Sequence, residues 1–411
     1  MQFSKKTFIA ASIGSFLEYY DFSLFSIFLP ILSPLIFHSS NYLNSLIKGY
    51  FILLLSIVFR PLGAFFFGVI GDFYGRKNAI FFSIYGMSIA TIIIGLTPEY
   101  NTIGFYSIFI FIFARMVQVF CFAGEFNGAA IYILEQPLNK KRQGLISGLL
   151  CATTLCGSLL ASISGIVTSL KISPDWSWRL AFIIGGIIGL IGGIYRKKLL
   201  ETIEFSPADK KLHSTINLFK NFKKEIILVF FAGGFITLPF TTALTVISSI
   251  LLVKGAITRF EFMILQTYLS IVAILFLIIS GYLTDKFTPK KIMMFGSLSF
   301  LVLIYPILKI IDMGQITLTI LGLTCLIALN EVCFAPSNVL LKKLFPVEFR
   351  YRGISIAFNI GMSVIGGLTP LIESLLYRID SKFINITIWP GFISLGLFIC
   401  LLNIKEFNRK E

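Results

Sequence analysis

The chain has 411 residues, of which 56% are apolar and only 13% charged, about half the charged share of soluble domains. One soluble core cannot absorb so much apolar surface, so the composition predicts an all-α, polytopic membrane protein. The net charge of +15 lies mostly in short loops between apolar runs, which indicates membrane topology and not nucleic-acid binding. Six cysteines without a C-x-x-C pair and only two histidines predict no metal site, no cofactor and no enzyme activity.

Twelve apolar runs follow one another along the chain, each long enough to cross a bilayer as a helix. They begin near residues 8, 46, 79, 103, 144 and 179, and then near 225, 262, 292, 315, 353 and 387. Loops on the side of the N-terminus hold 25 of the 35 Lys and Arg residues, and the opposite loops hold eight. This asymmetry predicts that both termini lie in the cytoplasm.

Two acidic residues stand well inside the first run. Glu18 and Asp21 are three positions apart and therefore share one helix face. Charges inside a span usually mark a functional site, and two close carboxylates resist ionising together, which suits proton exchange. The alternative is that they solvate a helix end at the headgroups. The aromatic residues beside them are candidates for a substrate cavity that encloses a quaternary ammonium group: Tyr19, Tyr20, Phe22 and Phe25.

The connection after the second run has the most specific motif of the chain, Gly71-Asp72-Phe73-Tyr74-Gly75-Arg76-Lys77. An aspartate at a helix end can pair with a basic residue or a helix N-terminus across the loop. The motif predicts a gating loop that latches two halves of the protein in one access state; an ordinary positively charged turn is the alternative. In the first half we assign to this latch Arg60, Gly68, Asp72, Gly75, Arg76 and Lys77.

The fourth run contains Arg115, Gln118 and then Glu125, which fall within an arc of about 80° on a helix. A buried arginine needs a partner, and a carboxylate is the best one. That partner is Glu125, a carboxylate of the first run, or the substrate; a structural salt bridge is the alternative. We predict that Glu18, Asp21, Arg115 and Glu125 couple transport to protons, and that Gln118 belongs to the substrate cavity.

The longest polar stretch, residues 196–224, divides the chain near its middle. It predicts a cytoplasmic linker between two six-helix halves, residues 1–195 and 225–411. The pattern Gly68-x-x-x-Asp72 recurs as Gly281-x-x-x-Asp285, 213 positions later, which adds Asp285 to the predicted latch. Halves that repeat in parallel place their substrate near the bilayer midplane between them.

The second half offers one further pair of polar residues, Asn330 and Glu331 in the tenth run. These are weaker candidates for a functional site, and helix packing is an equally good interpretation of them.

Several blocks together resemble the metabolite–proton symporter branch of the major facilitator superfamily, and within it the proline/betaine carriers. They are spread over most of the chain: Gly14-Ser15-Phe16-Leu17-Glu18-Tyr19-Tyr20-Asp21-Phe22, the loop around Asp72, Arg115-x-x-Gln118 running into Ala123-Gly124-Glu125, Glu201-Thr202-x-Glu204-Phe205, and Phe345-Pro346-x-x-x-Arg350-Tyr351-x-Gly353. The resemblance implies twelve transmembrane helices in two pseudo-symmetric halves, and alternating access in a bacterial inner membrane. It also implies proton-coupled import of a small metabolite such as proline or betaine, by a protein that functions as a monomer.

Other functions remain as alternatives: a carrier of a dicarboxylate or other organic acid, and a drug/proton antiporter. The fifth run reads Gly148 to Gly157 without proline, whereas such antiporters resemble one another in a Gly-Pro motif there. From other classes, a membrane-embedded enzyme needs a nucleophile or metal cluster that the sequence does not offer, and a sensor that does not transport is also compatible with it.

Overall fold

The computed structural model describes residues 5–37, 42–74, 76–122, 142–196 and 220–404, together with Leu134 and Leu218. Within these ranges it is almost wholly helical, which confirms the all-α prediction. Eleven helical segments there are long and apolar enough to cross a membrane, and Phe81–Leu96 is a shorter twelfth. The spans begin within about two helical turns of the positions predicted from the sequence.

The first six spans come from the following helices. They are α1 (Lys5–Ile36), α2 (Tyr42–Leu53) with α3 (Leu55–Tyr74), α4 (Arg76–Leu96), α6 (Phe105–Phe122), α8 (Gln143–Thr168) and α9 (Trp178–Arg196), with the short α5 (Tyr100–Ile103) and η2 (Asp175–Ser177) between them.

The last six spans are built in the same way. They are α11 (Lys223–Phe240) with η3 (Thr241–Ile247) and α12 (Ser248–Val253), α13 (Arg259–Lys286), α14 (Pro289–Ile311), α15 (Ile316–Leu341), α16 (Val347–Gly361) with η4 (Met362–Gly366) and α17 (Gly367–Asp380), and α18 (Ile388–Leu402) after the short η5 (Phe383–Thr387). Residues 197–217 of the predicted linker lie outside the described residues, so the boundaries of residues 196–224 stay a prediction.

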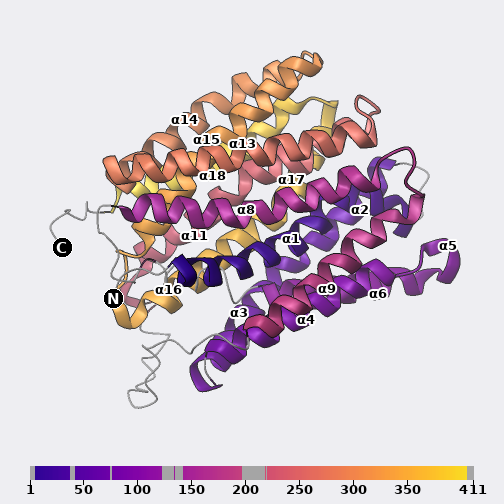
Figure 1. Cartoon of the computed structure of the whole chain (residues 1–411). Coiled ribbons are helices and arrows are strands. Elements are labelled where there is room, and N and C mark those ends of the chain that lie inside the picture. The colour runs from indigo at the N-terminus through magenta and orange to yellow at the C-terminus, as the bar shows by residue number, and fades with distance from the viewer. Residues whose placement is uncertain are drawn as a thin grey trace.

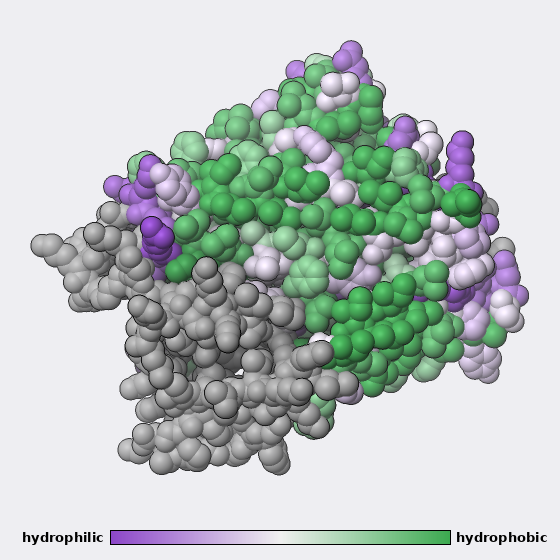
Figure 2. Space-filling model, in the orientation of Figure 1, coloured by the Kyte–Doolittle hydropathy of each residue, from purple (hydrophilic) through white to green (hydrophobic). Residues whose placement is uncertain are grey.

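The helices run side by side as one bundle, and the two ends of the chain lie at the same end of it (Figure 1). We call that end the terminal side and the opposite end the far side. Apolar side chains cover the middle of the face seen in Figure 2, and hydrophilic side chains gather toward its ends. Large apolar residues such as Phe65 and Phe295 are about 70% exposed; lipid chains, and not water, suit such a surface.

The two halves meet along α8 and α13, which lie beside each other in Figure 1. Small residues let these helices touch through their backbones: a methyl group added to Gly148 would stand 2.7 Å from the carbonyl oxygen of Leu277 and 2.9 Å from the Cα atom of Gly281. Toward the far side, Thr267 donates to the Ser162 hydroxyl at 3.0 Å. We call this contact the α8–α13 seam; close approach through small residues is how helices associate in membranes.

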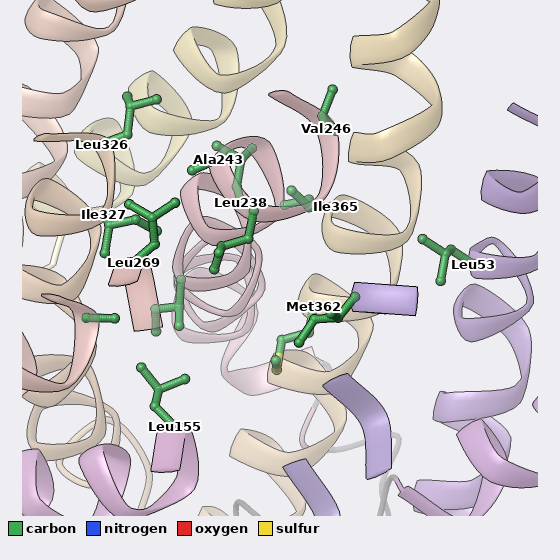
Figure 3. Packing of buried hydrophobic residues seen from close by; sticks show 14 of the residues in the cluster. Leu53, Leu155, Leu238, Ala243, Val246, Leu269, Leu326, Ile327, Met362 and Ile365 are labelled. Atoms are coloured by element: carbon green, nitrogen blue, oxygen red, sulfur yellow. The ribbon is translucent and has the colours of Figure 1, made fainter. Parts of the chain in front are cut away.

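Apolar packing also joins the halves across their centre. Leu53 and Leu155 of the first half belong to the same buried cluster as Leu238 and Met362 of the second (Figure 3). Two spans of the second half contain a π-helical turn at this depth, η3 after Pro239 and η4 before Pro370. A proline removes one backbone donor, and widened turns of this kind occur often at functional sites.

Candidate functional site

A cavity of about 130 Å³ lies between the halves. Its lining comes from the first, second, fourth and fifth spans and from the seventh, eighth, tenth and eleventh: Tyr19, Phe22, Ser23, Ser26, Ile27, Leu53, Arg60, Arg115, Phe122, Leu155, Ser158, Ile236, Thr237, Phe240, Thr241, Leu244, Thr245, Gln266, Ser270, Glu331, Phe334, Met362, Gly366, Gly367 and Pro370. Among the described residues the lining is mostly apolar, with a few polar groups and three charged side chains. Such a surface suits a small organic ligand that is held at a few polar points.

Arg115 is completely buried in α6, and its guanidinium group reaches the cavity wall. Its Nη1 donates to Gln118 Oε1 at 2.6 Å, and the group lies over the rings of Phe25 and Phe22, with its Cζ 4.0 and 4.9 Å from their centroids. Its Nε and Nη2 have no hydrogen-bond partner among the described residues. Two donor nitrogens of a buried guanidinium group, with three N–H groups between them, therefore remain for a ligand or for a group outside the described ranges.

Arg60 is the second arginine of the cavity. The sequence predicts that it belongs to the latch, whereas the structure places it in the cavity wall, where it is buried and its Cζ lies 4.5 Å from the centroid of the Phe122 ring. Its Nε donates to Asn359 Oδ1 at 2.9 Å, and its Nη2 lies 3.5 Å from the sulfur of Met362. Because Asn359 and Met362 belong to the second half, Arg60 joins the two halves at the ligand cavity itself.

A carboxylate faces the same cavity from the second half. Glu331 is buried in α15, and its Oε1 accepts a hydrogen bond from Asn330 Nδ2 at 3.3 Å. Asn330 also donates to the carbonyl oxygen of Ile236 at 3.0 Å, which positions it against α11. Glu331 Oε2 has no hydrogen-bond partner in the described part of the chain. The cavity thus has arginines on the first half and a carboxyl group on the second.

The two acids of the first span are buried, but neither lines the cavity. The Oδ1 atom of Asp21 would lie 3.2 Å from a methyl group on Gly185, so this carboxyl group packs against small residues of α9. Glu18 lies within electrostatic range of Arg60 and Tyr19. The fourth member of the predicted proton-coupling group, Glu125, lies outside the described residues.

The predicted substrate cavity divides in two. Tyr19 and Phe22 line the observed cavity, whereas Tyr20, Phe25 and Gln118 are absent from its lining. The Tyr20 hydroxyl donates to the carbonyl oxygen of Ala181 at 3.1 Å, on α9. Phe25 is buried between the Arg115 guanidinium group and the Phe111 ring, and the centroids of the Phe25 and Phe111 rings are 5.4 Å apart. Gln118 Nε2 donates to Thr91 Oγ1 at 2.8 Å and to the carbonyl oxygen of Asp21 at 3.3 Å, so Gln118 supports the arginine from behind.

A contact between the halves on the terminal side involves Asp285, at the end of α13. Its two carboxylate oxygens accept hydrogen bonds from the backbone N–H groups of Gly144 at 2.7 Å and Leu145 at 3.1 Å. These N–H groups lie in the first turn of α8, where backbone donors have no acceptor within the helix and a negative charge is stabilised. Gly75 lies outside the described residues, as do the side chains of Asp72, Arg76 and Lys77 and the surroundings of Gly68; their gating roles stay predictions.

Two groups of polar residues around the cavity were not predicted from the sequence. Gln266 and Ser270 of α13 line it, and Glu373 of α17 is buried close by. Glu373 carried a usable signal, because an acidic residue inside an apolar run is rare and functional by default.

The family model described as Major Facilitator Superfamily matches residues 11–253 and 229–411, and the chain belongs to this superfamily of membrane transporters. A Staphylococcus haemolyticus protein whose name assigns it to proline/betaine transport is 31% identical over 91% of this chain and 82% of its own length. The proline/betaine transporter of Escherichia coli K12 is 28% identical over 90% of this chain and 77% of its own.

Solved structures confirm the fold. A D-xylose–proton symporter superposes with a TM-score of 0.75 at 15% identity, covering 96% of both chains. The Escherichia coli fucose–proton symporter gives 0.66 at 13% identity, covering 97% of this chain and 98% of its own. The chain is therefore a multi-pass transporter of small molecules, as the sequence predicted, and not an enzyme.

Proposed function

We propose that this transporter imports a small zwitterion, such as proline or betaine, together with protons. The observation that carries the proposal is the pair of opposite charges across one cavity: Arg60 and Arg115 on the first half, and Glu331 on the second. A substrate with one carboxylate and one cationic nitrogen satisfies both walls at once.

The chemistry of each wall supports this substrate class. Arg115 has two donors without partners among the described residues, and a guanidinium group binds a carboxylate through paired N–H···O bonds. Phe334 lines the cavity beside Glu331 on the second half, and Tyr19 lines it from the first half; aromatic faces attract ammonium groups. The names of the Staphylococcus haemolyticus and Escherichia coli relatives point to the same class.

Charge and volume weigh against the two alternative substrate classes. A dicarboxylate would bring a second negative charge toward Glu331, and like charges in a low dielectric repel. A volume of about 130 Å³ is also small beside the roughly 300–1,000 Å³ of pockets for drug-sized ligands. Both points favour a compact zwitterion over an organic acid or a drug.

Proton coupling rests on the buried acids. Glu18, Asp21 and Glu125 are the proposed proton acceptors, and Arg115 the residue whose attraction changes when one of them is protonated; Glu331 is the next candidate. The solved symporters with the same fold carry protons by name. The proposal further places the terminal side in the cytoplasm of a bacterium and the protein in its inner membrane as a functional monomer.

Purified protein in liposomes tests the substrate. Radiolabelled proline and betaine should accumulate under an inward proton gradient, and unlabelled succinate should not compete. Glu331→Gln should raise the KM for betaine at least tenfold, since it removes the negative charge. The matched control is Glu261→Gln, an exposed residue at the start of α13 whose capping role glutamine also fills. Uptake of succinate in place of betaine would refute the proposal.

The proton acceptor requires a second measurement. We expect one of three single variants to lose gradient-driven accumulation and to keep the exchange of labelled for unlabelled substrate: Glu18→Gln, Asp21→Asn or Glu125→Gln. Exchange needs no net proton movement, so only the true acceptor should separate the two activities. If all three variants accumulate substrate as the wild type does, the acceptor lies elsewhere.

A further inference from the structure

Besides Glu331, the second half contains another buried carboxyl group, which lies just outside the cavity, toward the far side. Glu373 of α17 is completely buried and follows the cavity-lining Pro370 by three positions, or about one helical turn. It packs against η3, whose residues Thr241 and Thr245 line the cavity. Glu373 therefore stands beside the ligand cavity in the second half, whereas the acids of α1 belong to the first.

Among the described residues, Glu373 has one hydrogen-bond partner, and the single hydrogen of that partner has two possible acceptors. Thr242 Oγ1 lies 2.6 Å from Glu373 Oε1 and 3.0 Å from the carbonyl oxygen of Leu238. A hydroxyl group has a single hydrogen, and both neighbours accept if Glu373 is a carboxylate. A neutral carboxylic acid resolves this: it donates its O–H to Thr242 Oγ1, and Thr242 donates to Leu238.

Among the described residues, no basic side chain forms an ion pair with Glu373. Glu373 Oε2 has no hydrogen-bond partner within the described ranges, and neither ion pair found in those ranges includes Glu373. Of the elements packed on α17, α2 contributes Tyr50, whose hydroxyl donates to the carbonyl oxygen of Thr245 at 2.8 Å. The same helix carries the half-buried Tyr42 and the exposed Lys48. The sequences of η3 and η4 contain no titratable residue. An ionised, unpaired carboxylate is costly in such a place.

The remaining charged and titratable groups near this end of α17 are engaged elsewhere or lie farther out. Lys254, at the end of α12, sits over the ring of Tyr377, with its Nζ 5.0 Å from the centroid. Asp380, the last residue of α17, pairs with Lys382 at 3.7 Å, and both residues are exposed. On the cavity side, Arg60 of α3 donates to Asn359.

The same residues close the far side of the cavity. Tyr50 belongs to the first half and Thr245 to the second, so their hydrogen bond joins the halves above the cavity. Thr242, the partner of Glu373, is three residues from Thr245 in the same π-helical turn. Separation of α2 and α17 from η3 would break the first contact and admit water to the second.

We propose that Glu373 is a proton-binding site of the second half, protonated while the far side is closed and deprotonated to water when α17 moves away from η3. The proton leaves the carboxyl oxygen for a water molecule, and the Thr242 hydroxyl then turns its hydrogen from Leu238 to the carboxylate. This links proton release to opening of the far side. The proposal rests on the proposed function only where it assigns the proton to transport.

Infrared spectroscopy of the purified protein at pH 7, without substrate, tests the site directly. Glu373→Gln should remove one carbonyl-stretch band of a protonated carboxylic acid, which shifts in heavy water. Thr242→Val should shift that band without removing it, because the acid keeps its proton and loses its acceptor. Glu261→Gln should leave the band unchanged. An unaltered protonated-acid region in Glu373→Gln would overturn the proposal.

Transport by the same variant tests the role. The liposomes contain a pH-sensitive dye. Glu373→Gln should exchange proline at a rate within about threefold of the wild type. Its rate of proline-driven proton uptake should be at least tenfold lower than that of the wild type. Equal proton uptake in Glu373→Gln and wild type would refute the coupling role even if the band were found. A wild type that binds the proton at Glu373 but does not transport proline would instead refute the proposed function.

Discussion

The contact between Asp285 and the first turn of α8 makes a quantitative prediction about the access cycle. Its carboxylate accepts two backbone hydrogen bonds, at 2.7 and 3.1 Å, from the opposite half. Hydrogen bonds to a charged group contribute about 1.5–3 kcal/mol each, and a helix N-terminus adds about 0.3–1 kcal/mol. Asparagine keeps one neutral acceptor, so Asp285→Asn should destabilise this conformation by about 2 kcal/mol, which shifts the access equilibrium about 30-fold.

Alkylation of a cavity residue measures that shift. Ser26 lines the cavity, so Ser26→Cys in a background without the native cysteines can be labelled by a membrane-impermeant maleimide from the terminal side. Asp285→Asn should raise the labelling rate by up to about 30-fold, since it weakens a contact that closes this side.

The chain offers a matched control for this experiment. Asp312 accepts from the backbone N–H groups of Phe383 and Ile384 at 2.7 and 2.9 Å, the same geometry within one half. Asp312→Asn should cost similar stability and leave the labelling rate unchanged. Equal labelling rates in the two variants would refute the reasoning.

Three further predictions concern the latch, the packing and the topology. Asp72→Asn should lower the maximal transport rate and leave substrate affinity within about threefold; loss of binding in a folded variant would contradict a gating role. Gly157→Ala should destabilise the protein by about 1–3 kcal/mol in thermal melts, because the methyl group would stand 2.1 Å from the carbonyl oxygen of Phe16; Gly391→Ala, whose nearest neighbour is 3.8 Å away, should not. Reporter fusions at Ser206 and Lys405 should read cytoplasmic, and an exported signal at either position would exclude the twelve-span topology.

The twelve spans could be predicted from the sequence because a membrane imposes their length and apolar character. The charged residues of the cavity could be found in part for the same reason: Arg115 and Glu331 are conspicuous in apolar runs. Glu373 is equally conspicuous in its apolar run, but it lies in none of the recognised motifs and was therefore not predicted as a site residue.

The direction of each side chain could not be predicted in the same way. Glu18 and Asp21 share a helix face, but α1 contacts α4, α6, α8 and α9 on several sides. Asp21 therefore meets α9, while Tyr19 between the two acids meets the cavity. Spacing along one helix fixes which residues share a face, and only the neighbouring helices decide what that face contacts.

The α8–α13 seam has a consequence for how the two halves can move. At Gly148 and Gly281 the backbones of α8 and α13 are in contact, so this part of the seam can serve as a pivot. Other contacts between the halves lie away from these glycines, such as Arg60 with Asn359 and Tyr50 with the Thr245 carbonyl. A small rotation about the seam would move the atoms of these contacts farther apart than it moves the glycines. The energy barrier of the access cycle is then concentrated in a few polar contacts.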